Sequence, residues 1–232
     1  MKKNYGIIVA AGKSRRMNSA VSKQFIFISG KPILAHTLDA FEKSSLIDQI
    51  VLVINESDIE KCKKIIINKY RYKKVREIIA GGEERQYSVL NGLKALPSDT
   101  NLVAIHDGAR FLITPELIDK ATKAAYDSDG VVVAIPVQDT IKESRSDKTI
   151  SNTFNRNILW AAQTPQVFPY SIIMEAYLKA SETGFIGTDD ASLAENLGYE
   201  IHLVRGSVEN IKITTNFDLI LAETILNRRR LK

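Results

Sequence analysis

Small residues followed by cations lie near the start of the chain, where a short apolar segment ends. In chain order they are Ala10, Ala11, Gly12, Lys13, Arg15, Arg16 and Lys23. Small residues let backbone N–H groups approach an anion closely, and neighbouring cations neutralise its charge. The pattern favours a polyphosphate site, with a solvated basic turn as the alternative. It is not a Walker P-loop, because position 7 is Ile where that motif needs Gly, and no dinucleotide Gly-x-Gly is present.

Two glycines end a second apolar segment, at residues 75–80. Gly81 and Gly82 are followed by Glu83 and Glu84, and Ser88 lies within the first turns of an expected helix. One interpretation is a flat slot for a nucleotide base, with Gly82 and Ser88 close to the base. The alternative is an ordinary turn between strand and helix, in which the helix dipole favours the acidic residues.

A carboxylate directly follows a third apolar segment, at residues 102–106. Mg²⁺ favours one or two carboxylates together with phosphate oxygens, so Asp107 is a candidate metal ligand. A single carboxylate does not form a metal site made of protein groups alone. His106 is interpreted as a packed histidine at the strand end and not as a base.

An alternation of strands and helices must position these groups. Strands are expected at residues 5–10, 49–54, 75–80, 102–106, 130–137 and 200–204, and helices at 32–41, 58–70, 84–96, 115–126, 171–181 and 217–227. This order predicts an α/β fold of three layers with a mostly parallel twisted sheet. Ligands of such sheets bind beyond the carboxyl ends of the strands. The loops after Ala10, Ala80, His106 and Val137 should therefore share one crevice.

Residues 138–160 break the alternation. The segment is polar, and a turn near Ser146-Asp147 would make it a β-hairpin. A lone two-stranded hairpin is marginally stable in water, so this one must lie on its own body or on a second subunit. An ordinary surface excursion is the alternative. We expect one domain over residues 1–232, with the hairpin as an arm within it.

The composition excludes several classes of protein. The chain has 232 residues, of which 44% are hydrophobic and 25% charged, as in soluble globular proteins. The single cysteine, Cys62, excludes an intrachain disulfide and a multi-cysteine zinc site. No apolar run is long enough for a membrane span or a signal peptide, which favours a cytoplasmic location. The net charge of +5 comes mostly from Arg228, Arg229, Arg230 and Lys232, interpreted as a solvated, frayed end, so no basic face for nucleic acid is expected.

Eight ordered motifs resemble one enzyme family over about residues 5–226. They are Ala10-Ala11-Gly12-x3-Arg16-Met17, Lys23-Gln24, Gly81-Gly82-x2-Arg85-x2-Ser88, His106-Asp107-x-Ala109-Arg110, Asp139-Thr140, Arg156-Asn157-x-Leu159-Trp160, Thr164-Pro165-Gln166 and Asn210-Ile211-Lys212. Their order and spacing are similar to those of the 2-C-methyl-D-erythritol 4-phosphate cytidylyltransferase family. The resemblance implies a sheet of the nucleotide-diphospho-sugar transferase type, with a Rossmann-like nucleotide-binding half and a protruding hairpin arm.

The resemblance also implies a reaction and a role for each site residue. The family transfers a cytidylyl group from CTP to the polyol phosphate and releases pyrophosphate, with Mg²⁺ as cofactor. Arg16 and Lys23 would stabilise the transition state, Asp107 would hold Mg²⁺, and Arg156, Lys212 and Thr140 would orient the polyol phosphate. The residues implied to bind the nucleotide are Ala10, Ala11, Gly12, Lys13, Gly82, Glu83, Ser88, Asp107 and Gly108. Glu83 stands where the family has Asp.

The family is a homodimer in which the arm reaches the partner's site, so Thr140 and Arg156 are expected to serve the neighbouring subunit. Read without the resemblance, Arg156 and Lys212 are surface cations and Trp160 is a core residue. Three alternatives stay open: a ribitol-5-phosphate cytidylyltransferase, a CTP-binding protein without catalysis, and a nucleic-acid binder. The motif that ends in Trp160 favours the methylerythritol branch, and the near-neutral body argues against nucleic acid.

Overall fold

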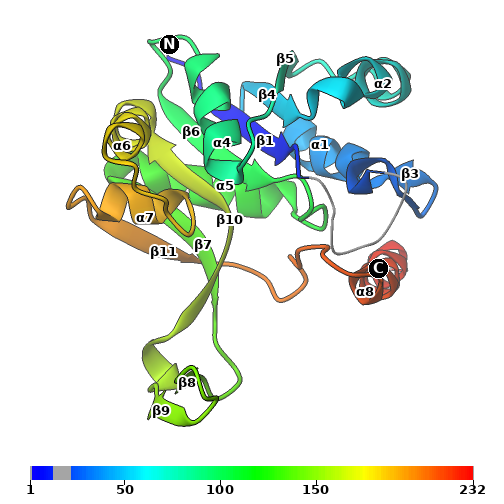
Figure 1. The fold of residues 1–232 in the computed structure, drawn as a ribbon. Coiled ribbons are helices and arrows are strands. Elements are labelled where there is room, and N and C mark those ends of the chain that lie inside the picture. The colour runs from blue at the N-terminus through cyan, green and yellow to red at the C-terminus, as the bar shows by residue number, and fades with distance from the viewer. Residues whose placement is uncertain (1, 13–21, 232) are drawn as a thin grey trace.

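The computed structural model describes residues 2–12 and 22–231. Within these residues a seven-stranded sheet has the order β11-β7-β10-β6-β1-β4-β5. Its strands are β1 (Tyr5–Ala10), β4 (Gln49–Ile54), β5 (Val75–Ala80), β6 (Leu102–Asp107), β7 (Gly130–Pro136), β10 (Trp160–Pro169) and β11 (Ile201–Arg205). β10 runs antiparallel to β6 and β7, and the other pairs are parallel. The predicted, mostly parallel α/β sheet is confirmed (Figure 1).

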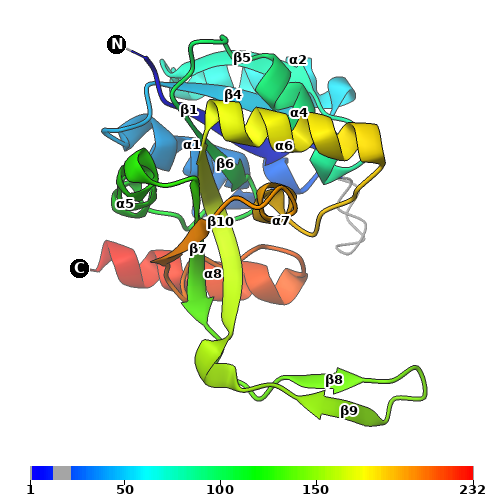
Figure 2. The same cartoon turned by 90° about the vertical axis from the view of Figure 1, so that its left-hand side faces the viewer.

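Helices cover both faces of the sheet because its strands are apolar on both sides. Ile8 of β1 packs in one cluster with residues of α1 (Ile33–Lys43) and α5 (Pro115–Ala124). Ile7 packs on the opposite face with α4 (Arg85–Lys94) and α6 (Tyr170–Thr183). The alternation of neighbouring side chains along a strand produces this division. Figure 2 shows the resulting three layers.

Shorter elements complete the body. One helical stretch joins α2 (Ile59–Cys62), a π-helical turn (Lys63–Ile67) and α3 (Asn68–Tyr70). A 3₁₀ turn (Lys23–Phe25) precedes the short hairpin of β2 (Phe27–Ile28) and β3 (Lys31–Pro32), and further 3₁₀ turns span Glu56–Asp58, Ala125–Asp127 and Arg156–Ile158. The last helices are α7 (Asp190–Glu195) and α8 (Asn216–Arg230), each begun by a capping box, at Asp189 and Thr215. Among the described residues, none of the helices is both long and apolar enough to cross a membrane.

The strand order creates a switch point beside β1. The chain passes from β1 outward to β4 and β5, and then returns to place β6 on the other side of β1. Loops that leave β1 and β6 therefore run in different directions and open a crevice at the carboxyl ends of these strands. Val9 pairs with Asp107 at this edge, which puts the loop after Ala10 next to the carboxylate.

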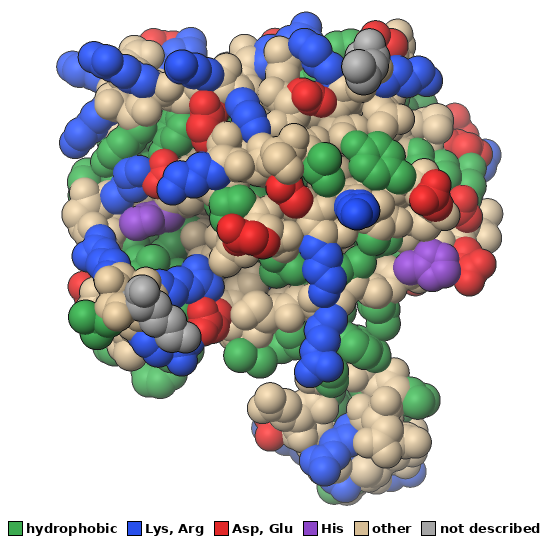
Figure 3. All heavy atoms as spheres, turned by 180° about the vertical axis from the view of Figure 1, so that it is seen from behind, with side chains coloured by type: hydrophobic (Ala, Val, Ile, Leu, Met, Phe, Trp, Pro, Cys, Tyr) green, Lys and Arg blue, Asp and Glu red, His purple; other side chains and the backbone are tan. Residues whose placement is uncertain are grey.

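The predicted hairpin is confirmed as an arm. It consists of β8 (Lys142–Ser144) and β9 (Ile150–Thr153), and every residue from 138 to 158 is exposed within the single chain. The arm stands clear of the body in the space-filling view (Figure 3). The same view shows acidic, basic and apolar side chains interspersed on this side of the body.

Four sequence-based expectations were wrong or incomplete. β10 was not predicted, because its polar side chains and Pro165 interrupt an apolar strand pattern. The short helix α7 was not predicted either. Trp160 is 38% exposed in the chain and is not a core residue. The C-terminal arginines are not frayed, because α8 continues to Arg230 and both Arg228 and Arg229 pair with Glu209.

Candidate active site

A cleft of about 690 Å³ opens at the carboxyl ends of β1 and β6. It is lined by Val9, Ala10, Ala11, Gly12, Lys23, Gln24, Ile33, Gly82, Glu83, Glu84, Arg85, Ser88, Asp107, Gly108, Ala109, Lys212 and Thr214. The loops after Ala10, Ala80 and His106 therefore share one crevice, as predicted. The loop after Val137 leads into the arm and does not line this cleft.

The two glycines occupy a turn where no side chain fits. A Cβ atom on Gly81 would lie 2.3 Å from the Cβ of Ala11, and one on Gly82 would lie 2.5 Å from the Cβ of Tyr87. The amide of Gly82 donates to Ser88 Oγ over 3.0 Å, and this hydroxyl donates to Glu84 O. Of the two glycines, Gly82 lines the cleft, and its lack of a side chain leaves space there. Glu83 is exposed at the rim of the cleft.

Asp107 places a nearly buried carboxylate on the cleft floor. The residue is 7% exposed, Oδ1 accepts from Arg85 Nε at 2.9 Å, and Oδ2 lies 2.7 Å from Lys212 Nζ. Burial by itself raises the pKa of Asp107, but the charges of Arg85 and Lys212 outweigh burial and hold that pKa far below its ordinary value. The group is therefore ionised at neutral pH.

The donor set around Asp107 fits a divalent cation that also binds phosphate. The described residues contain no group of three or more His, Cys, Asp or Glu side chains able to hold a metal by themselves. One carboxylate facing a cleft lined by small residues and cations leaves the other positions to phosphate oxygens and water. This combination is typical of Mg²⁺ with a nucleotide.

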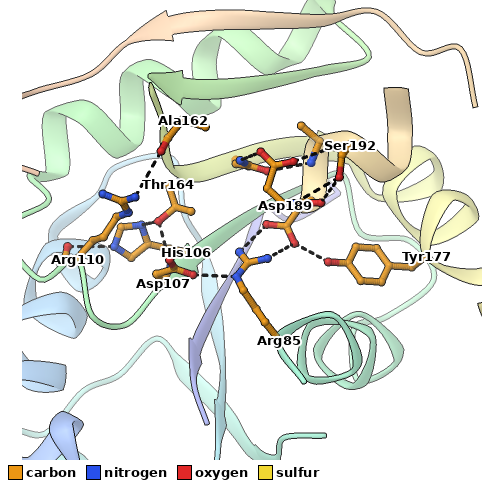
Figure 4. A network of polar contacts seen from close by, with 12 residues as sticks. Arg85, His106, Asp107, Arg110, Ala162, Thr164, Tyr177, Asp189 and Ser192 are labelled. Carbon is orange, nitrogen blue, oxygen red and sulfur yellow. Dashed lines mark hydrogen bonds and ion pairs between the residues drawn. The ribbon is translucent and has the colours of Figure 1, made fainter. Parts of the chain in front are cut away.

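His106 is fully buried at the end of β6, as expected of a packed histidine. Thr164 Oγ accepts the amide of Asp107 at 3.0 Å and lies 2.9 Å from His106 Nδ1. The other ring nitrogen then donates to Arg110 O at 3.2 Å. Burial lowers the pKa of His106 to about 4, and the ring is neutral. Figure 4 shows these contacts beside the Arg85 network.

Lys212 reaches the cleft because its loop is fastened on both sides. Arg110 Nη1 donates to Asn210 O at 2.9 Å, and Asn210 Nδ2 donates to Thr164 O at 2.9 Å. Lys23 Nζ donates to Ile213 O at 2.6 Å. Lys212 is exposed, as its isolated interpretation as a surface cation expects, and it also pairs with Asp107 in the cleft.

The remaining predicted residues divide into two groups. Lys13 and Arg16 lie outside the described residues. Thr140 and Arg156 lie on the exposed arm, where Arg156 Nη1 donates to Gln138 O at 2.9 Å, and neither lines the cleft of its own chain.

Sequence reasoning gave no role to Arg85, Gln24 or Thr214, which also line the cleft. Arg85 occupies a fixed place in the motif Gly81-Gly82-x2-Arg85, and this place is the signal that could have identified it.

Comparisons with known proteins give the same family that the motifs indicated. The family profile described as IspD, 2-C-methyl-D-erythritol 4-phosphate cytidylyltransferase, matches residues 5–228. The enzyme of that name from Caldanaerobacter subterraneus subsp. tengcongensis is 46% identical over 222 residues, covering 96% of this chain and 98% of the relative. The one from Alkaliphilus metalliredigens is 48% identical over 224 residues, covering 97% and 93%.

Solved structures agree with the sequence relatives. The 4-diphosphocytidyl-2C-methyl-D-erythritol synthase of Anaerococcus prevotii superposes with a TM-score of 0.87 at 33% identity, covering 97% of this chain and 96% of that one. The 2-C-methyl-D-erythritol 4-phosphate cytidylyltransferase of Thermus thermophilus gives 0.78 at 28% identity, covering 95% and 98%. The chain belongs to the 2-C-methyl-D-erythritol 4-phosphate cytidylyltransferase family.

Proposed function

We propose that the chain transfers the cytidylyl group of CTP to 2-C-methyl-D-erythritol 4-phosphate, releasing pyrophosphate, in the non-mevalonate isoprenoid pathway. One observation beside family membership carries this proposal. A buried, ionised carboxylate, Asp107, sits between two cations at the floor of a cleft that Gly82 also lines. We also propose that residues 1–232 form one cytidylyltransferase domain.

The site suits a reaction that needs no general base. The phosphate of the second substrate is already an anion at neutral pH and can attack the α-phosphorus of CTP directly. His106, the histidine next to Asp107, is buried and neutral and does not face the cleft as a base. Catalysis then consists of holding two anions in line and neutralising the charge of the transition state.

The residues expected to bind CTP have distinct roles in this proposal. The backbone of Ala10, Ala11 and Gly12, with Lys13, would hold the triphosphate. Gly82, Glu83 and Ser88 would hold the base, and Gly108 would contact the ribose or phosphate through its backbone. Lys23 and Arg16 would stabilise the charge that develops on the transferring phosphoryl group.

Asp107 would hold Mg²⁺ as its one protein carboxylate. A divalent cation held there would supply positive charge that offsets the negative charge of the phosphates. Its fit rests on the donor set described above, and Asp107 stays ionised for this role because Arg85 and Lys212 keep its pKa low.

The second substrate would be held by residues of two chains. Lys212 in the cleft would bind its phosphate, while Thr140 and Arg156 would come from the arm of a partner subunit. The arm exposes Ile141, Ile150, Phe154, Ile158 and Trp160, a surface that supports burial against a second copy. We propose a homodimer on this basis, and we also propose that it is cytoplasmic.

Pyrophosphate release tests the proposal. The chain is assayed with each of the four common nucleoside triphosphates against methylerythritol phosphate and ribitol 5-phosphate, with and without Mg²⁺. Release is expected with CTP and methylerythritol phosphate only. Lys23→Ala should lower the rate by about 10²–10³-fold, while Lys63→Ala, an exposed lysine paired with Glu60, should leave it unchanged.

Two results would contradict it. Faster turnover of ribitol 5-phosphate would make the chain a pentitol-phosphate enzyme. Binding of CTP with no pyrophosphate from either substrate would leave it a nucleotide-binding protein without catalysis.

A further inference from the structure

Arg85, the first residue of α4, joins two carboxylates that come from different elements. Its Nε donates to Asp107 Oδ1 at 2.9 Å, and its Nη1 and Nη2 donate to the two oxygens of Asp190 at 2.7 Å each. Figure 4 shows the guanidinium between the two. A guanidinium is planar and rigid, so the two-point contact with Asp190 fixes the direction in which Nε points.

Asp190 is itself fixed from behind. It is 0% exposed, and Tyr177, buried in α6, donates its hydroxyl to Oδ1 at 2.5 Å. The start of α7 is tied to β10 because the amide of Ala191 donates to Gln166 Oε1 at 2.9 Å. Arg85 is thus anchored to the interior of the body on the side away from the cleft.

The contact of Arg85 Nε with Asp107 is not needed for an ion pair between Arg85 and Asp190. Asp190 alone uses both terminal nitrogens of the guanidinium and compensates its charge. The remaining Nε–H is aimed at Oδ1 of Asp107, which leaves Oδ2 turned to Lys212 and the cleft. Lys212 approaches from a loop, whereas Arg85 approaches from an anchored helix end, so Arg85 holds the carboxylate whichever way Lys212 turns.

We propose that Arg85, supported by Asp190 and Tyr177, is a positioning residue that orients the Asp107 carboxylate toward the divalent cation and the phosphates of the nucleotide. Arg85 acts through Asp107 and not on the reacting atoms. The inference rests on the proposed function for the identity of the nucleotide and of the second substrate.

The test measures Mn²⁺ binding by electron paramagnetic resonance in the presence of CTP, with no second substrate, together with kcat and KM. The variant Arg85→Met/Asp190→Asn removes both charges of this ion pair at once, so neither is left without the other, and the amide oxygen introduced at position 190 can still accept from Tyr177. We expect a thermal midpoint close to that of the native chain, at least tenfold weaker Mn²⁺ binding, and kcat lowered about 10²-fold with less than threefold change in KM for the polyol phosphate.

Gln86 provides the matched control. It follows Arg85 on α4 and contacts the same segment ahead of α7, through Phe185 O and the amide of Gly187, without touching Asp107. Gln86→Ala should loosen that segment but keep native Mn²⁺ affinity. Arg85→Lys keeps the positive charge, but its single ammonium group cannot reach both carboxylates. We therefore expect the Arg85→Lys chain to retain less than half of the Mn²⁺ affinity that the double variant loses.

A folded double variant with native Mn²⁺ affinity and kcat would overturn the inference. A Gln86→Ala chain that loses as much Mn²⁺ affinity and kcat as the double variant would also overturn it. If the double variant does not fold, Asp190→Asn alone decides, because it weakens the anchor and leaves Arg85 and Asp107 intact. Unchanged Mn²⁺ binding there would refute the role. Failure of the native chain to use methylerythritol phosphate would instead overturn the proposed function, and the Mn²⁺ comparison would still stand.

Discussion

The hydroxyl of Thr164 lies 2.9 Å from Nδ1 of His106 and joins the antiparallel strand β10 to β6 directly beneath the cleft. The same hydroxyl accepts the amide of Asp107 at 3.0 Å. His106 Nε2 faces Arg110 O at 3.2 Å and so carries the ring proton, which leaves Nδ1 of the neutral ring to accept from Thr164. Protonation of Nδ1 would remove this acceptor and place a charge in a buried site.

The unfolding free energy should therefore fall as the pH is lowered. Burial lowers the pKa of His106 to about 4 in the folded protein, against about 6.5 in the unfolded chain. Between these values the unfolded state binds a proton that the folded state does not, so this stability is complete above pH 6.5 and is lost toward pH 4. The loss at pH 4 is about 3 kcal/mol.

Urea unfolding at several pH values measures this effect, with His106→Asn as the comparison. The variant should be less stable at neutral pH but show a shallower decline on acidification. A His106 ring resonance that titrates near pH 6.5 in the folded native chain would contradict the assignment.

The glycines of the cleft should separate folding from nucleotide binding. A Cβ on Gly12 meets no atom of the described residues within 4 Å, whereas one on Gly81 would lie 2.3 Å from the Cβ of Ala11. We expect Gly12→Ala to keep its thermal midpoint but to raise KM for CTP severalfold, because the new methyl group occupies space left for the triphosphate. Gly81→Ala should instead cost about 1–3 kcal/mol of stability through overpacking.

Calorimetry and CTP titration distinguish the two variants. Normal CTP binding by Gly12→Ala would remove Gly12 from the nucleotide site. Native stability of Gly81→Ala would mean that the turn has room that the present geometry does not provide.

Mixed subunits should regain activity if the arm serves the neighbouring site. Lys23→Ala and Arg156→Ala chains are each expected to be inactive alone. A heterodimer would hold one site with an intact Lys23 and an intact Arg156 from its partner. Random mixing then yields about a quarter of native activity, since half of the dimers are mixed and each has one working site of two.

Refolding the two chains together and measuring pyrophosphate release checks this. Each variant refolded alone is the control. If a mixture shown to contain heterodimers recovers no activity, Arg156 contributes to the active site of its own chain or to no active site.

The C-terminal helix should stabilise the loop that carries Lys212. Arg229 donates to Leu112 O at 2.8 Å and to Glu209 at 2.9 Å, so it clamps α8 against the start of that loop. Arg229→Ala is expected to lower the unfolding free energy by about 1–2 kcal/mol. Arg230→Ala removes only an exposed contact to Ser29 O and should cost less than half as much. Denaturant melts measure both variants. Equal losses of unfolding free energy would show that the contacts of Arg229 stabilise the fold no more than the exposed contact of Arg230 does.

Local sequence patterns were sufficient for the elements whose burial is apolar. The strands at Tyr5–Ala10, Gln49–Ile54 and Val75–Ala80 have the predicted bounds, since each is an apolar run next to turn-forming residues. The arm was predicted from its polar alternation and central turn. The order and spacing of the motifs indicated the family without any knowledge of the fold.

β10 escaped prediction for a physical reason. Gln163, Thr164 and Gln166 are polar yet buried, at 5%, 5% and 1% exposure. Their partners are Ser207, His106 and the start of α7, all distant in the chain. Such a strand is stabilised by hydrogen bonds that form only after the body assembles, so its own residues do not mark it as core.

By itself, the order of residues determined the alternation of strands and helices, the edge of the sheet at which the cleft opens, and the cations and glycines available there. The tertiary structure alone decided how charges pair: Lys212 with Asp107, Arg85 with both Asp107 and Asp190, and Arg229 with Glu209. Periodicity reports which face of an element is buried. Which charge meets which depends on the crossing of elements far apart in the chain, and only the folded body brings them within a few ångströms.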